Sequence, residues 1–83
     1  MPDTLHNDLY RRLIDRLAEA RSEAGMTQQI LADRLDKPQS FVAKVEGYER
    51  RLDIIEFLEI SSAIGYDPIP SLGQAFKDIR KIR

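Results

Sequence analysis

The chain has 83 residues, of which 42% are hydrophobic and 33% are charged, a composition typical of one small folded domain rather than a disordered segment. A domain of this length has a small core and little room for a deep, dry pocket, so an independent enzyme is disfavoured. The absence of cysteine excludes disulfides and thiolate metal sites. The single histidine, His6, excludes zinc sites built from several histidines, and we expect its side chain to be exposed and without a role.

No apolar run approaches the roughly 20 residues that a membrane-spanning helix needs, so we expect no membrane partner. The first residues lack the basic-then-apolar order of a signal peptide, and the sequence therefore predicts a cytoplasmic protein. The formal net charge of -1 differs from the strongly basic balance of many nucleic-acid-binding domains. A nucleic-acid function therefore depends on how the charges are distributed along the chain.

The N-terminal part of the chain predicts one amphipathic helix after a loose start at residues 1–6. Asn7 or Asp8 can cap its first turn, and Gly25 suits the left-handed residue that ends a helix. Between these positions apolar residues recur at steps of three and four, the period of a helix with one buried face: Leu9, Leu13, Leu17, Ala20 and Ala24.

Two short helices follow in tandem. Thr27 is a good N-cap for the first, which ends at Asp36-Lys37-Pro38 because proline disfavours the helical conformation of the preceding residue. Pro38 can open the second, about 38–46, which Gly47 ends. The predicted buried residues are Ile30, Leu31, Ala32 and Leu35 of the first helix and Val42 and Val45 of the second, with Gln39, Ser40, Ala43 and Lys44 on the opposite side.

The C-terminal half predicts two further helices. Asp53 caps the first, which Gly65 ends, and its apolar residues cover more than one stripe, so we expect it to meet the core and a second surface. Residues 67–70 predict a turn, after which Ser71 can cap a last helix that carries Leu72, Phe76 and Ile79 at helical spacing.

No stretch alternates with the period of a strand, so the predicted fold is all-α, a compact bundle of about five short helices. We expect one domain over residues 1–83, with a core at about 9–68 and a C-terminal extension at 69–83.

Two short helices separated by about three residues are typical of the helix-turn-helix, whose second helix lies in the major groove of DNA. The outward residues of that helix must hydrogen-bond base edges. Gln39, Ser40 and Lys44 suit this chemistry, because glutamine pairs with adenine, lysine with guanine acceptors and serine with either.

Residues from about Leu13 to Pro68 resemble the phage-repressor/Cro-type (XRE-like) helix-turn-helix family, which implies a lambda-repressor-like fold. The resemblance rests on many positions spread along the chain: Arg21, Gly25-Met26-Thr27-Gln28, Leu31-Ala32-Asp33-Arg34-Leu35, Pro38-Gln39-Ser40-Phe41-Val42, Lys44-Val45-Glu46, Glu49-Arg50-Arg51-Leu52 and Ala63-Ile64-Gly65-Tyr66-Asp67-Pro68.

The resemblance also implies roles for individual residues. Gln28 would hold a phosphate and brace the recognition helix, and Arg50 and Arg51 would grip the DNA backbone. Arg21 and Glu46 would form the family's internal ion pair, which ties the first helix to the recognition helix. The predicted DNA-contacting set is Thr27, Gln28, Lys37, Gln39, Ser40, Lys44, Arg50 and Arg51.

The sequence departs from the family pattern after the recognition helix. Gly47 stands one position early, and Tyr48 occupies the usual glycine position. Either Tyr48 adopts a strained positive φ, or the loop turns one residue sooner and Arg50 points elsewhere. Asp36 replaces the usual turn glycine, a milder change because aspartate tolerates the left-handed region. Ile30 stands where a glutamate would complete a capping box with Thr27.

The charges are segregated along the chain. Residues 52–68 carry only acidic charges, at Asp53, Glu56, Glu59 and Asp67, so the fourth helix is expected to point away from phosphate. The last residues are mostly basic. DNA binding needs local neutralisation of phosphate rather than a positive total, and we expect modest affinity per monomer.

The C-terminal half has more large apolar residues than a small core can hold. Those left exposed would form a patch of the kind that marks an interface. The predicted contact is a homodimer, which reads two half-sites about one helical turn apart. The expected interface residues are Phe57, Tyr66, Ile69, Leu72 and Phe76.

These features predict a duplex-DNA-binding transcriptional regulator that acts as a homodimeric repressor on an operator, with no enzymatic activity, metal or cofactor. We expect no second domain that senses a small molecule, and so no effector is predicted. Two alternatives stay open: an antitoxin or restriction–modification controller with the same DNA chemistry, or an interaction module that has lost DNA contact.

Overall fold

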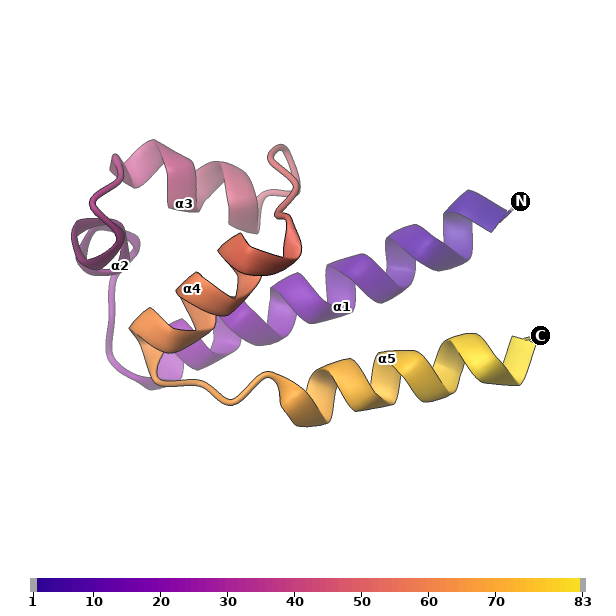
Figure 1. Cartoon of the computed structure of the whole chain (residues 1–83). Helices are drawn as coiled ribbons and strands as arrows, with labels where there is room; N and C mark the ends of the chain where they lie inside the picture. Colours follow the sequence, from indigo (N-terminus) through magenta and orange to yellow (C-terminus); the bar gives the residue numbers. More distant parts are fainter. Residues whose placement is uncertain (1, 83) are drawn as a thin grey trace.

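The computed structural model describes the backbone of residues 2–82 and the side chains of residues 7–81, and this part of the chain is helical with short connections. Helices α2, α3 and α4 gather around one end of the long α1, and α5 runs back beside α1, so that the two termini lie at the same end of the molecule (Figure 1). The helices are α1 (Pro2–Glu23), α2 (Gln28–Leu35), α3 (Gln39–Glu46), α4 (Ile54–Ile64) and α5 (Ile69–Ile82).

One core lies where the first four helices meet. Ile14 is its most enclosed large side chain, with 1% of its surface exposed, and burying such a side chain stabilises a fold by about 1.5–3 kcal/mol. Helix α5 joins this core through half-buried residues such as Leu72, so it is the peripheral helix. The buried cluster comprises Ile14, Leu17, Leu31, Ala32, Val42, Val45, Phe57, Ile60 and Ile64.

Local capping chemistry sets several predicted helix ends. Thr27 Oγ1 accepts a hydrogen bond from the Ile30 backbone at 3.1 Å, which confirms it as the N-cap of α2. Asp53 caps α4 and forms a reciprocal capping box with Glu56. Gly25 and Gly65 have φ values of 74° and 82°, the left-handed conformation that ends α1 and α4 and that a glycine adopts without strain.

Two predicted helix starts were wrong. Helix α1 begins at Pro2 rather than at residue 7 or 8, because proline is favoured in the first turn and the helical pattern extends back to it. Helix α5 begins at Ile69 rather than after Ser71, since the Asp67 carboxylate accepts a hydrogen bond from the Ile69 backbone at 3.0 Å. Residues 69 and 70 therefore belong to the first turn of α5 and not to the loop before it.

Smaller corrections concern single residues. Pro38 is the N-cap of α3 and lies just outside it, so the helix starts at Gln39. Ile30 was predicted to be buried but is 42% exposed, because the turn that holds Leu31 and Ala32 against the core directs it outward. The prediction for the His6 side chain lies outside the described side chains.

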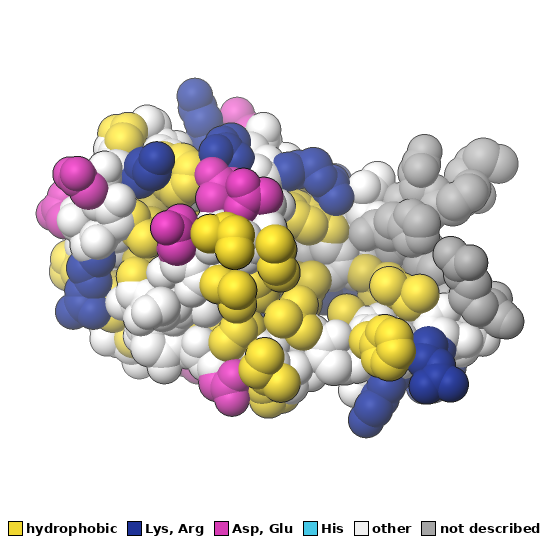
Figure 2. Space-filling view, viewed as in Figure 1, with side chains coloured by type: hydrophobic (Ala, Val, Ile, Leu, Met, Phe, Trp, Pro, Cys, Tyr) yellow, Lys and Arg dark blue, Asp and Glu magenta, His cyan; other side chains and the backbone are white. Residues whose placement is uncertain are grey.

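An exposed apolar surface covers α4 and α5, which we call the α4–α5 face (Figure 2). Phe57 is not part of it: it was predicted at an interface, but it is 6% exposed because it shares the inward phase of Ile60 and Ile64. Tyr66 and Leu72 are half-buried against the core, whereas Ile69 and Phe76 are exposed as predicted. The α4–α5 face consists of Ile54, Ile55, Leu58, Ile69, Phe76 and Ile79.

Candidate nucleic-acid interface

Helices α2 and α3 form a helix-turn-helix. They pack closely on each other, and the turn between them runs through Asp36, which has a left-handed φ of 57°. Val42 and Val45 anchor the inner side of α3 in the core. The outer side carries Gln39, Ser40 and Lys44, all exposed, and we call these three residues the α3 edge. The α3 edge is thus fixed from behind and open in front.

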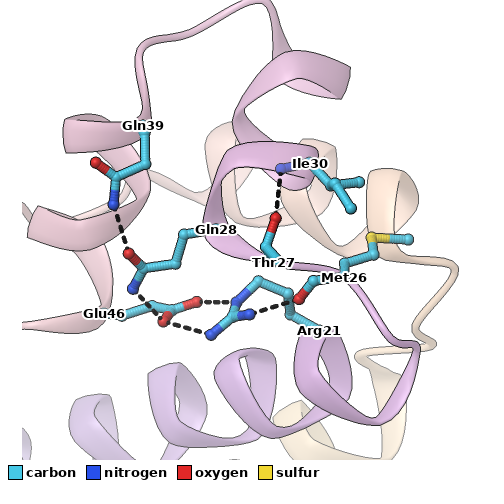
Figure 3. Close-up of polar contacts among 7 residues, drawn as sticks. All are labelled: Arg21, Met26, Thr27, Gln28, Ile30, Gln39 and Glu46. Carbon is cyan, nitrogen blue, oxygen red and sulfur yellow. Dashed lines mark hydrogen bonds and ion pairs between the residues drawn. The ribbon is translucent and has the colours of Figure 1, made fainter.

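A bidentate ion pair holds the C-terminal end of α3 to α1 (Figure 3). Arg21 Nε lies 2.6 Å from Glu46 Oε2, and Arg21 Nη2 donates to Glu46 Oε1 at 3.0 Å. Arg21 Nη1 also donates to the Met26 carbonyl at 2.6 Å. Both charged side chains are only 15% exposed, so each depends on the other for compensation. The structure therefore joins the two residues for which the sequence predicted a structural pair.

Gln28 extends this network to the start of α3. Its amide nitrogen donates to Glu46 Oε1 at 2.9 Å, and its amide oxygen accepts from Gln39 Nε2 at 2.7 Å (Figure 3). Hydrogen bonds to a charged group are stronger than neutral ones, and a connected set fixes its members' orientations. The network orients the Gln39 amide while leaving its oxygen and one N–H for a ligand.

The other predicted contact residues lie around the same end of the bundle. Ser40 and Lys44 make no side-chain hydrogen bond or ion pair among the described residues, so their polar groups face solvent. Lys37 lies with its ammonium 5.4 Å from the centroid of the Phe41 ring and is exposed. Thr27 is exposed at the start of α2, next to Gln28, although its hydroxyl already accepts the capping bond from Ile30.

The loop after α3 keeps its left-handed residue at Tyr48. The φ of Tyr48 is 65°, whereas that of Gly47 is an ordinary −87°, so the loop does not turn one residue sooner. Tyr48 and Glu49 donate to the carbonyls of Val45 and Lys44 at 3.1 and 2.8 Å, the arrangement of a Schellman motif, where glycine is usual. A left-handed L-residue costs about 1–2 kcal/mol.

Space, rather than φ, favours glycine at position 47. A Cβ at residue 47 would lie 3.2 Å from the Ala43 carbonyl oxygen, so a side chain there would crowd the last turn of α3. Of the two alternatives that the sequence leaves open, the structure therefore has the strained tyrosine.

Side chains of α1 hold this loop. The Tyr48 hydroxyl donates to the Asp15 carboxylate, which raises the pKa of Tyr48, and the Arg11 guanidinium lies 4.8 Å from the Tyr48 ring centroid. Farther along the loop, the Tyr10 hydroxyl accepts a hydrogen bond from the Leu52 backbone at 3.2 Å. Helix α1 therefore contacts the loop near both of its ends.

The two loop arginines differ in their surroundings. Arg50 Nη2 lies 2.7 Å from Glu56 Oε2, a contact that lowers the pKa of Glu56, and Arg50 also donates to the Arg51 carbonyl oxygen. Arg51 stacks over the Tyr10 ring at 4.1 Å and pairs with no carboxylate among the described residues. The prediction treated both arginines alike, but the structure brings only Arg50 to an acid.

Sequence reasoning missed the partners of these side chains. The Asp53-x-x-Glu56 spacing is a capping-box signal that could have identified Glu56 as structurally engaged. For Tyr10 and Asp15 no local signal exists, since their loop partners are 42 and 33 residues away along the chain.

The described residues show neither a metal cluster nor a membrane helix. No group of three or more His, Cys, Asp or Glu side chains among them could hold a metal ion. Within the same part of the chain, no helix combines the length and the apolar character that crossing a membrane requires.

Comparison with known proteins agrees with this geometry. A solved structure of an XRE-family like protein from Pseudomonas syringae pv. tomato str. DC3000 shares 51% sequence identity with the chain, with a TM-score of 0.85 over 92% of this chain and 93% of that one. The chain belongs to the XRE-like helix-turn-helix family. Membership in the XRE-like family supports a DNA-binding regulator as the general class and agrees with the predicted all-α fold. No protein-family model and no curated protein matches the chain.

Proposed function

We propose that this XRE-like protein binds specific duplex DNA sequences with α3 in the major groove and represses transcription as a homodimer. The observation that carries the proposal is the α3 edge itself: Gln39, Ser40 and Lys44 are exposed together on a helix whose other side is buried. Groove recognition requires such a helix, anchored on one side and polar on the other.

The α3 edge has the chemistry for reading bases. A glutamine amide can pair with adenine N6 and N7, and a lysine ammonium donates to guanine O6 and N7. Gln39 is already oriented by Gln28, so little conformational entropy remains to be lost when its amide meets a base. Lys44 lies about one and a half turns farther along α3, where it would reach a neighbouring base pair or a phosphate.

Phosphate contacts are proposed for the residues around the α3 edge. Thr27 and Gln28 stand at the N-terminus of α2, where backbone N–H groups favour an anion. Lys37 and Arg51 add exposed positive charges. The Arg50 charge is already paired with Glu56, so we expect a smaller contribution from it than from Arg51.

The α4–α5 face is proposed as the dimer contact with a second copy of the chain. Ile55, Ile69 and Phe76 are 60%, 64% and 62% exposed, and apolar side chains gathered in this way mark an interface (Figure 2). One recognition helix reads only a few base pairs, whereas a two-fold dimer reads two half-sites and so gains specificity. The proposed interface keeps the predicted Ile69 and Phe76. It omits the buried Phe57 and the half-buried Tyr66 and Leu72, and it adds other exposed residues of α4 and α5: Ile54, Ile55, Leu58 and Ile79.

A salt series on DNA binding tests the function. Sites are first selected from random duplexes, and the dissociation constant is then measured at increasing salt for the wild type and for Lys44→Ala. We expect affinity to fall steeply with salt, and Lys44→Ala to weaken selected sites more than random DNA. Lys77→Ala, which removes an exposed charge from α5, is the matched control and is expected to bind selected sites nearly as the wild type does.

One rival function has a specific observation in its favour. Arg50 is engaged by Glu56, as expected if the fold served protein interaction and DNA contact had been lost. Binding that is flat with salt or absent across operator-sized duplexes would support that rival and contradict the proposal.

A further inference from the structure

Tyr48 combines an unfavourable backbone with a bonded side chain. It is one of two non-glycine residues with positive φ among those described, the other being Asp36. Glycine would fit the Tyr48 backbone without strain, so local geometry alone does not account for a tyrosine. Its side chain, however, makes contacts that glycine lacks, through its hydroxyl to Asp15 and through its ring to Arg11. This difference between tyrosine and glycine at position 48 points to a role for the tyrosine side chain itself.

The contacts of Tyr48 belong to a two-point attachment of the loop to α1. At one point Asp15 and Arg11 hold Tyr48, and at the other Tyr10 bonds the Leu52 backbone. Residues 49–51 lie between these points and are exposed. A loop attached at both ends has fewer conformations than a loop attached at one, so its exposed side chains lose less entropy on binding.

Arg51 is the side chain whose position this attachment fixes before binding. The guanidinium carbon of Arg51 lies 4.1 Å from the centroid of the Tyr10 ring, and Tyr10 belongs to α1, the helix that also holds Tyr48. Arg51 pairs with no carboxylate among the described residues. We propose that Tyr48 is a positioning residue for DNA binding, because its bonds to α1 hold the loop in the conformation that presents Arg51 to a phosphate. This inference rests on the proposed function and adds to it a residue that touches no DNA.

The experiment compares Tyr48→Gly, Tyr48→Phe and the wild type. Tyr48→Gly relieves the positive φ and removes both side-chain contacts, so its melting temperature is expected to stay close to that of the wild type. Tyr48→Phe keeps the ring and the strain but loses the hydroxyl bond to Asp15. Three quantities are measured: the melting temperature, the affinity for a selected duplex with its salt dependence, and the rate at which trypsin cleaves the folded protein after Arg50 and Arg51.

We expect Tyr48→Gly to bind the duplex about 3- to 10-fold more weakly, the effect of ordering one or two side chains on binding. The salt dependence should also be smaller, because the unattached loop leaves Arg51 away from the phosphate in part of the complexes and fewer counterions are released. Trypsin should cleave its loop faster than that of the wild type, because local opening exposes the backbone. Tyr48→Phe should fall between the two in both measurements. A purely structural role would change the melting temperature and leave the salt dependence unaltered.

Asp15→Asn tests the other partner of the hydrogen bond, with Glu19→Gln as its matched control. Both changes remove one exposed acid from α1, which by itself would favour binding to phosphate. Only Asp15→Asn weakens the attachment of Tyr48, so we expect it to bind DNA more weakly than Glu19→Gln.

Each result decides a different claim. Wild-type affinity in Tyr48→Gly, whether or not its loop is cleaved faster, would overturn the positioning role and leave the proposed function intact. A wild-type protein that shows no salt-dependent duplex binding would overturn the proposed function, and with it the inference.

Discussion

The α3 edge and the α4–α5 face are both exposed, but they are supported in different ways. Behind the α3 edge a chain of hydrogen bonds runs from Arg21 through Glu46 and Gln28 to Gln39. The α4–α5 face is bordered instead by partly exposed ion pairs, Arg50 with Glu56 on α4 and Arg12 with Asp78 on α5, and its own exposed side chains are apolar. A surface that reads bases needs fixed donors and acceptors, whereas a surface that meets a second copy needs apolar area. The contrast agrees with the two separate tasks that we propose for this small domain, DNA binding and pairing with a second copy.

The largest effect is expected from a substitution that breaks the hydrogen-bond network behind the α3 edge. Glu46→Ala leaves Arg21 without its partner at 15% exposure and also removes the acceptor of Gln28. We expect the free energy of unfolding to fall by about 3 kcal/mol, the lower end of the range for removing one member of a buried pair, because this pair is only partly buried. Urea denaturation measures this, with Glu49→Ala, an exposed acid three residues on, expected to change it by no more than about 0.5 kcal/mol. Equal effects of the two changes would refute the role given to the network.

The next largest effect is expected from a change on the α4–α5 face, which should alter self-association and leave the α3 edge intact. Ile55→Lys places a charge on the face, and we expect self-association to weaken by about 30-fold or more, as for a central interface residue. Sedimentation equilibrium measures the dimer constant. Ile30→Lys is the matched control, since Ile30 is 42% exposed but lies on α2 outside the face. A protein that is monomeric at every concentration before any change is made would remove the dimer from the account.

A smaller effect distinguishes the two loop arginines. Arg51→Ala should reduce the slope of log affinity against log salt by about one, because one phosphate contact is lost. Arg50→Ala should reduce it less, since the Arg50 charge is already paired with Glu56 in the free protein. The slopes come from titrations of one selected duplex at several salt concentrations. If the two variants lose the same slope, the pairing of Arg50 has no bearing on DNA binding.

The smallest effect is a dependence of stability on pH. The bond to Arg50 holds the pKa of Glu56 below its ordinary value in the folded protein. The stabilisation from this group is therefore fully present above the ordinary glutamate range and is lost as the pH falls through the lowered pKa. Glu56→Gln should be less stable than the wild type near neutral pH, with the difference shrinking in acid. Thermal melts between neutral and acidic pH check this, with Glu59→Gln as the control for losing an exposed carboxylate.

Much of the fold could be predicted because its signals are local. Thr27, Asp53, Gly25 and Gly65 are each read from the chemistry of a helix end. The starts of α1 and α5 could not be predicted in the same way. Acceptable caps occur at several neighbouring positions, and Pro2 and Asp67 compete with the residues that the pattern favoured.

The core was predicted less completely than the helices. Ile14 is the most enclosed large side chain, yet it lies beside the stripe that the spacing of Leu9, Leu13 and Leu17 suggests. Phe57 was expected at an interface because large apolar residues outnumbered the space for them. The helical phase of Phe57 with Ile60 places it in the core instead, and Ile55 faces outward.

In the candidate site, too, some features could be predicted from the sequence and others depend on how the helices pack. The residue types on the α3 edge could be predicted from the spacing of two short helices, and the Arg21–Glu46 pair from resemblance to the XRE-like family. The bond from Gln39 to Gln28 and that from Tyr48 to Asp15 join residues 11 and 33 positions apart. Such pairings depend on how the helices pack, and no pattern within a single helix reports them.

Base discrimination by Gln39 tests the central claim most directly. Relative affinities of the wild type and Gln39→Ala are measured on a selected duplex and on every single-base-pair substitution of it. We predict that Gln39→Ala loses about 1–3 kcal/mol of discrimination at one base-pair position in each half-site and keeps its preferences elsewhere. An unchanged preference at every position, with affinity lowered equally on all duplexes, would contradict the placement of the α3 edge against the bases.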